Sequence, residues 1–220
     1  MTDLRTGAAR VDQVPMPLPI AALPRNKAGY PIPWFIDRRA DVDGEPDFRI
    51  MDERKLRLAV AEQLCWVCGT PLARLASFVI GPMCAVNRTS AEPPCHHPCA
   101  TYSARVCPFL STPAMTRRER HMPEGHVEPP GVMLRRNPGV TLVWTTAQAA
   151  AYPYEDGLLF EIGEPKRVEW WTQGRPATAA EVLASIDSGM PALREMAEAE
   201  GEDAEAELTR RYGVVVGMLG

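Results

Sequence analysis

Two short clusters of cysteine and histidine, about thirty residues apart, constrain this chain more than any other feature. The first is CWVCG, in which Cys65 and Cys68 are three residues apart and Gly69 follows. Two thiolates at this spacing bind one metal ion when the chain turns between them, and the glycine relieves that turn. The second cluster is CHHPC, in which His96 and Cys99 share a face if a helix begins there. Together these four side chains predict a tetrahedral site for structural zinc.

The same clusters permit other sets of ligands. Cys95 can replace His96, and His97 can replace either of them. Cys84 and Cys107 can join the CWVCG pair in an all-thiolate site for zinc or for an iron–sulfur cluster. Taken individually, these two cysteines are better explained as small buried hydrophobic residues. We therefore expect Zn²⁺ as the cofactor, with an iron–sulfur cluster as the alternative.

The state of the thiols depends on the cellular compartment. The N-terminal stretch MTDLRTGAARVDQ lacks the apolar core of a secretory signal, and the sequence has no run of about 18 apolar residues. We therefore expect a cytoplasmic protein that does not cross a membrane. Because cytoplasmic thiols stay reduced, the six cysteines are expected to be metal ligands or buried thiols rather than disulfides.

The rest of the sequence predicts short helices and strands separated by irregular segments, as the 22 prolines require. Helices are expected at 52–64, 98–107, 178–188, 191–200 and 202–212, with a break at Gly189 and Pro191. Strands are expected at 34–36, 77–81, 157–163 and 166–172, and on both sides of an Asn137-Pro138-Gly139 turn. Residues 82–94 and 108–131 are expected to be loops.

This order of elements predicts an α+β protein with a single domain and an antiparallel sheet. Residues 1–33 form a proline-rich N-terminal arm, which we expect to lie extended across the domain surface. Residues 34–176 form the α+β domain, with a metal module similar to a zinc knuckle at 65–107. Residues 177–220 form a C-terminal helical segment packed on that domain.

The charge distribution indicates a candidate contact surface. The net charge of −4 argues against strong non-specific binding to nucleic acid. Residues 101–140 nevertheless carry six arginines against three glutamates, whereas residues 181–207 carry nine acidic residues against one arginine. Because arginine suits phosphate, the predicted nucleic-acid contacts are Arg117, Arg118, Arg120, Arg135 and Arg136.

Four stretches of the chain, CWVCG, FVIGPMCAVNRTSAEPPCHHPCA, CPFL and WWTQGRPATAAEVLASIDSGMPAL, resemble a family of proteins from phages, prophages and bacterial genomes. The resemblance covers roughly residues 24–200, and no activity is established for the family. In the family pattern the histidine at position 96 and the cysteine at position 99 belong to the motif, whereas Cys95 and His97 are departures from it. The resemblance thus implies Cys65, Cys68, His96 and Cys99 as one metal set, with Cys95 as an additional candidate.

Three classes of function fit these observations. The first is a zinc-stabilised binding protein that contacts nucleic acid or a protein partner. The second is a metal-dependent enzyme acting on nucleotides or nucleic acid, but four protein ligands would close the coordination position that catalysis needs. The third is an adaptor that binds a host protein through its acidic C-terminal helices. The complete set of four ligands favours a binding protein over an enzyme.

Overall fold

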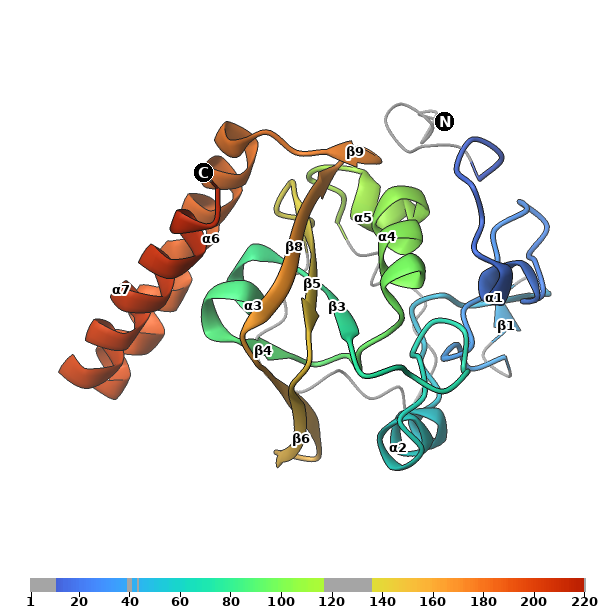
Figure 1. The fold of residues 1–220 in the computed structure, drawn as a ribbon, viewed down its shortest axis with the longest axis horizontal. Coiled ribbons are helices and arrows are strands. Elements are labelled where there is room, and N and C mark those ends of the chain that lie inside the picture. Colours follow the sequence, from blue (N-terminus) through green and yellow to red (C-terminus); the bar gives the residue numbers. More distant parts are fainter. Residues whose placement is uncertain (1–10, 39–40, 43, 117–135, 220) are drawn as a thin grey trace.

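A four-stranded antiparallel sheet lies at the centre of the molecule and separates two hydrophobic cores (Figure 1). The computed structural model describes residues 11–38, 41–42, 44–116 and 136–219. The strand order is β3-β5-β8-β9, with β3 at Ala76–Ile80, β5 at Thr141–Thr146, β8 at Pro165–Thr172 and β9 at Arg175–Pro176. Every residue of the inner strand β5 is buried, which indicates that both faces of the sheet are covered.

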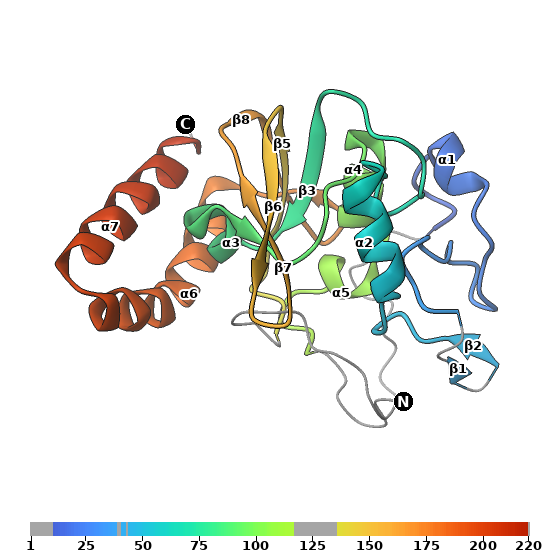
Figure 2. The ribbon, with the colours of Figure 1, turned by 90° about the horizontal axis from the view of Figure 1, so that it is seen from below.

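Helices pack on both faces of this sheet. In chain order, the helices of the described residues are α1 (Leu18–Ala21), α2 (Glu53–Ala61), α3 (Pro82–Asn87), α4 (His97–Val106), α5 (Pro108–Ser111), α6 (Ala179–Glu200) and α7 (Glu202–Gly217). Figures 1 and 2 show α3, α6 and α7 on one side of the sheet and α4 with α1 on the other. The predicted α+β class, with an antiparallel sheet and C-terminal helices, is confirmed.

Alternate residues of the sheet enter opposite cores, as the period of a strand requires. Phe78, Leu142 and Trp144 belong to the core that contains residues of α3, α6 and α7. Val143 and Trp171 belong to the second core, which contains residues of α4, the arm and the first cysteine pair. The three cysteines of the predicted metal set and the C-terminal helices therefore belong to different cores on opposite sides of one sheet.

A second sheet extends from the first core. Its strands are β4 (Thr89–Ser90), β7 (Gly157–Ile162) and β6 (Ala149–Tyr154), in the order β4-β7-β6. A smaller two-stranded sheet pairs β1 (Asp41–Val42) with β2 (Glu45–Pro46). Strand β6 was not expected from the sequence, because its three alanines and one proline are weak strand formers.

The predicted helix starts are confirmed where a capping side chain is present. The Asp52 carboxylate accepts the Arg54 N–H at the start of α2, 3.0 Å away. At the start of α6, Thr178 and Glu181 form a reciprocal capping box. The Arg175 guanidinium and the Thr178 backbone N–H both donate to Glu181, and they lower the pKa of that carboxyl to about 2.

The predicted break at Gly189 and Pro191 is wrong, because α6 continues through both residues. Pro191 removes one backbone hydrogen bond and is exposed, so the helix accommodates its ring toward solvent. Gly189 is buried against α3, where an added Cβ would lie 2.5 Å from Met83 Sδ. The glycine therefore permits close packing between two helices, and this packing overrides its poor helix propensity.

Three further expectations from the sequence require correction. The stretch from Trp34 to Ile36 is not a strand: Trp34 lies in a turn, and Ile36 forms only an isolated bridge to Met51. Residues 82–87 were expected in a loop but form α3, since Pro82 suits the first helical turn. The loop expected from residue 108 begins instead with the short helix α5.

The Asn137-Pro138-Gly139 segment does not form the predicted hairpin turn with β5. The partner strand was expected on residues 131–136, of which 131–135 lie outside the described residues. Strand β5 pairs instead with β3 and β8. The buried Asn137 side chain donates to the carbonyls of Phe109 and Leu110, 2.6 and 3.1 Å away, and so attaches this segment to α5.

Within the described residues, the structure contains no helix with the length and apolar composition that a membrane crossing requires.

Candidate metal centre

The first pair of candidate ligands lies in a tight turn between α2 and β3. The Cys65 N–H donates to the Thr70 carbonyl over 2.8 Å, and the Gly69 N–H donates to the Cys65 carbonyl over 2.8 Å. Gly69 has a φ of +73°, a left-handed conformation that glycine adopts without a steric penalty. Both cysteines are buried. The turn therefore directs the two sulfur atoms toward the same interior point, as the spacing of the motif predicts.

The second pair lies at the start of α4. His96 is the N-cap residue of this helix, Pro98 occupies its first turn, and Cys99 follows three positions after the histidine. The preceding residue, Cys95, pairs with Ser77 through backbone hydrogen bonds in both directions, each 2.8 Å long. This bridge fixes the start of α4 beside β3 and brings the second pair of ligands to the first.

The structure brings Cys65, Cys68, His96 and Cys99 together. Their ligand atoms, three sulfurs and one imidazole nitrogen, all lie within 4.8 Å of one another. His96 Nδ1 is 3.5 Å from Cys68 Sγ and 4.0 Å from Cys99 Sγ. The three cysteines are buried and the histidine is half-buried. Three sulfurs and one nitrogen at this separation can hold a metal ion in tetrahedral coordination.

The orientation of the His96 ring is set by a backbone carbonyl. The ring atom Nε2 lies 2.9 Å from the carbonyl oxygen of Pro71. Because a carbonyl oxygen only accepts, Nε2 must carry the proton and donate it. The other ring atom, Nδ1, then presents its lone pair to the sulfurs. A ligating histidine held through its second nitrogen in this way is the usual arrangement at metal sites.

The sulfur atoms are crowded enough to shift one another's ionisation in opposite directions. The neighbouring thiols of Cys68, Cys95 and Cys99 stabilise the Cys65 thiolate, and they hold the pKa of Cys65 well below its usual value. The same contact with Cys65 raises the pKa of Cys99. The backbone N–H of His96 also donates to Cys65 Sγ, over 3.3 Å. A divalent cation bound at this point would replace the shared protons, because cysteine ligands bind a metal as thiolates.

The alternative ligands proposed from the sequence have other contacts. The Cys95 thiol donates to the Ser77 carbonyl, 3.2 Å away. His97 Nε2 lies 2.7 Å from a carboxylate oxygen of Glu169 on β8. Cys84 lies on α3, on the other side of the sheet, and Cys107 is the C-cap of α4. Burial raises the pKa of both of these thiols, that of Cys84 to about 11, which favours small neutral side chains at both positions.

Aromatic residues connect the cysteine turn to the segment before α2. The Trp66 ring stacks on Phe35 with centroids 4.8 Å apart, and it meets Trp34 edge-on at 6.3 Å. The Trp34 N–H donates to the Val67 carbonyl over 2.7 Å. The stretch that was expected to be a strand thus packs on the turn. None of these contacts was predictable from the spacing of the cysteines, because all of them depend on tertiary packing.

Of the predicted arginine contacts, the structure describes only Arg136. Arg117, Arg118, Arg120 and Arg135 lie outside the described residues. Arg136 is exposed and forms an isolated bridge with Thr116, and the Asn137 N–H donates to the Met115 carbonyl over 2.8 Å. The two ends of the arginine-rich segment, residues 116 and 136, therefore lie side by side, and the residue after Arg136 is hydrogen-bonded to α5.

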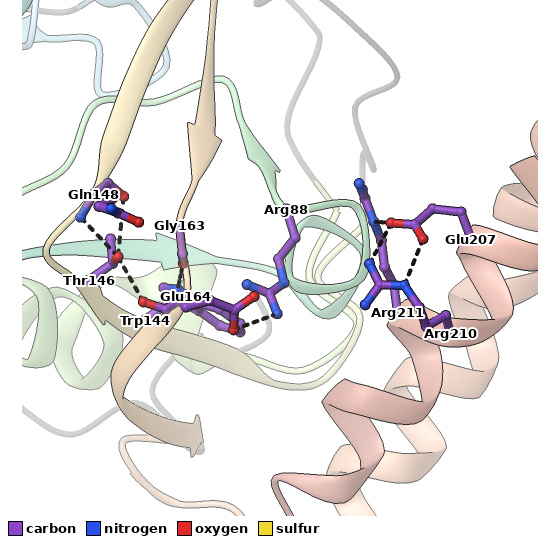
Figure 3. Close-up of polar contacts among 9 residues, drawn as sticks. All are labelled: Arg88, Trp144, Thr146, Gln148, Gly163, Glu164, Glu207, Arg210 and Arg211. Carbon is purple, nitrogen blue, oxygen red and sulfur yellow. Dashed lines mark hydrogen bonds and ion pairs between the residues drawn. The ribbon is translucent and has the colours of Figure 1, made fainter.

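Arg88, which follows the predicted loop residue Asn87, is the C-cap residue of α3. Its guanidinium lies 4.4 Å from the centroid of the Trp144 ring and 3.4 Å from a Glu164 oxygen (Figure 3). The backbone carbonyl of Asn87 accepts a hydrogen bond from Arg211 of α7 over 2.7 Å. These contacts join the end of α3 to β5 and to α7, so packing explains the positions of Asn87 and Arg88.

In comparisons with known proteins, the chain matched no family model, no curated protein and no solved structure.

The turn at Gly69 provides a test of how tightly the site is packed. An alanine Cβ there would lie 2.5 Å from two atoms of the Trp34 ring and would also hold a left-handed φ. We expect Gly69→Ala to lower the free energy of unfolding by about 2–5 kcal/mol, from about 1–2 for the backbone and about 1–3 for overpacking. Chemical denaturation measures this change.

The matched control is Gly29→Ala, since Gly29 has a φ of +85° and a Cβ there meets no atom of the described residues within 4 Å. It should cost only the backbone contribution, about 1–2 kcal/mol. Equal losses in the two variants would show that contact with Trp34 does not tighten the cysteine turn.

Proposed function

We propose that this protein is a zinc-stabilised binding protein, in which one zinc ion bound by Cys65, Cys68, His96 and Cys99 organises the side of the sheet that carries α4. The observation that carries the proposal is the convergence of four ligand atoms, from segments separated by 28 positions, to within 4.8 Å. Zinc suits this donor set, because it accepts thiolate and imidazole together and prefers four ligands in a tetrahedron.

The geometry supports a structural rather than a catalytic role for the ion. Four protein ligands leave no coordination position for a water molecule or a substrate. The three cysteines are buried, and one of them, Cys65, has no exposed surface. Such a centre contributes folding free energy and holds segments in place. A reducing compartment such as the cytoplasm would keep its thiols available for the metal.

We further propose that the partner is nucleic acid and that the arginine-rich segment between α5 and β5 contacts its phosphates. The support is the placement of the ends of this segment. Thr116 and Arg136 bridge to each other, and Asn137 attaches the returning chain to α5 by the two side-chain hydrogen bonds to Phe109 and Leu110. A segment whose ends are held by a rigid element is a common position for binding residues.

Metal analysis of protein purified without added metal tests the zinc site. We expect stoichiometric zinc in the wild-type chain and loss of most of the zinc in Cys65→Ser, because a hydroxyl is a poor replacement for a thiolate ligand. Cys84→Ser is the matched control, since Cys84 lies on the other side of the sheet and should keep the zinc. Absence of zinc from the wild-type protein, or equal zinc in both variants, would contradict the proposal.

Binding to a mixed-sequence oligonucleotide at several salt concentrations tests the partner. Replacing Arg117, Arg118 and Arg120 together by alanine should weaken binding and reduce the slope of log K against log salt by about one for each lost phosphate contact. The control triple variant changes Arg38, Arg57 and Arg194, three exposed arginines of other segments, and removes the same charge. Equal losses in the two triple variants would show that only net charge matters, and unchanged binding would exclude the arginine segment.

A further inference from the structure

The metal centre contains one more candidate ligand than a tetrahedron requires. The Cys95 side chain is buried, with 2% of its surface exposed, and lies beside the four ligands of the centre. Its thiol donates to the carbonyl of Ser77 over 3.2 Å. Cys95 therefore belongs to the same buried cluster as Cys65, Cys68 and Cys99, while its sulfur stays outside the group formed by the four ligands.

Cys95 can turn toward the centre at little structural cost. Its backbone N–H and carbonyl are both paired with Ser77, at 2.8 Å each, so its Cα position is fixed. Rotation about the Cα–Cβ bond alone moves the sulfur away from the Ser77 carbonyl. That carbonyl still accepts the Cys95 N–H when the thiol leaves, so the rotation creates no unsatisfied buried acceptor.

His96 is the ligand that such a rotation would displace. It is half-buried, whereas the three cysteines are buried. Its Nε2 donates to the Pro71 carbonyl, and apart from the ligand sulfurs that face Nδ1 this is the hydrogen bond that the described structure gives its ring. An imidazole that leaves the metal can remain on this carbonyl or hydrate at the surface, and neither alternative leaves a buried charge.

We propose that the centre has two coordination modes, and that a soft, thiophilic metal ion is held by the four thiolates of Cys65, Cys68, Cys95 and Cys99. In this mode the Cys95 sulfur forms the fourth metal–sulfur bond and releases its proton to solvent, and neutral His96 leaves the metal. Zinc accepts nitrogen and sulfur together, whereas softer ions favour thiolates. The proposal rests on the zinc site described above and extends it to a second class of metal.

Cadmium is the probe that separates the two modes. The ¹¹³Cd NMR shift of the full-length chain reports how many thiolates bind the ion. We expect the wild-type protein to give a four-thiolate signal, and Cys95→Ser to give a signal from three thiolates and one nitrogen. Serine at this position retains a hydroxyl donor for Ser77. Zinc affinity should therefore change by less than about threefold in Cys95→Ser, whereas cadmium affinity should fall by about tenfold or more.

The outcomes distinguish this inference from the zinc site itself. Wild-type protein that binds zinc but gives a cadmium signal from three thiolates and one nitrogen would overturn the second mode and leave the zinc site intact. Wild-type protein that binds neither ion would overturn both. The control variant Cys84→Ser should keep the four-thiolate signal, and a change in that variant as large as in Cys95→Ser would also contradict the role of Cys95.

Discussion

The convergence of four side chains that could hold one metal ion is the constraint on which this side of the molecule depends. Hydrogen bonds among the crowded sulfurs lower the pKa of Cys65 and raise that of Cys99, so the centre already favours a thiolate at one ligand. A bound cation would favour thiolates at all three cysteines. Zinc binding of this kind contributes on the order of 10 kcal/mol to the folding of small modules. A contribution of that size exceeds what any single contact in the second core can supply.

Through its ligands, a bound ion would also fix the positions of α2, α4 and the second core. Cys65 and Cys68 follow α2, whereas His96 and Cys99 begin α4, so one ion would hold the ends of two helices. The second core, which includes Val14 and Ile20 of the arm, surrounds the same ligands. The first core has a different basis: Trp144, Phe78 and the α6–α7 pair pack on the opposite face of the sheet. Local stability within a domain follows such divisions, so the two faces are expected to open with different free energies.

The parts of the structure that could be predicted from the sequence are those encoded over a few residues. The spacing of Cys65 and Cys68 predicts a turn, and Pro98 with His96 and Cys99 predicts a helix start, and both occur. The capping box at Thr178 similarly marks the start of α6.

The parts that could not be predicted depend on contacts between distant residues. His97 is a plausible ligand by type, but it pairs with Glu169, 72 positions away. Pro191 would end an isolated helix, but α6 continues where it packs on α3 and α7. The ring orientation of His96 depends on the Pro71 carbonyl, and a backbone acceptor leaves no signal in a sequence.

Hydrogen exchange with and without a chelator is the most direct measure of whether the ion organises this side of the sheet. We expect chelation to lower protection first in the cysteine turn at 65–69 and in α4, which carry the ligands. The backbone amides of α3, α6 and α7 should keep most of their protection, because the first core holds them without the metal. Equal protection of the cysteine turn and α4 in the two states, with metal loss verified in the same sample, would contradict the claim that the ion organises this region.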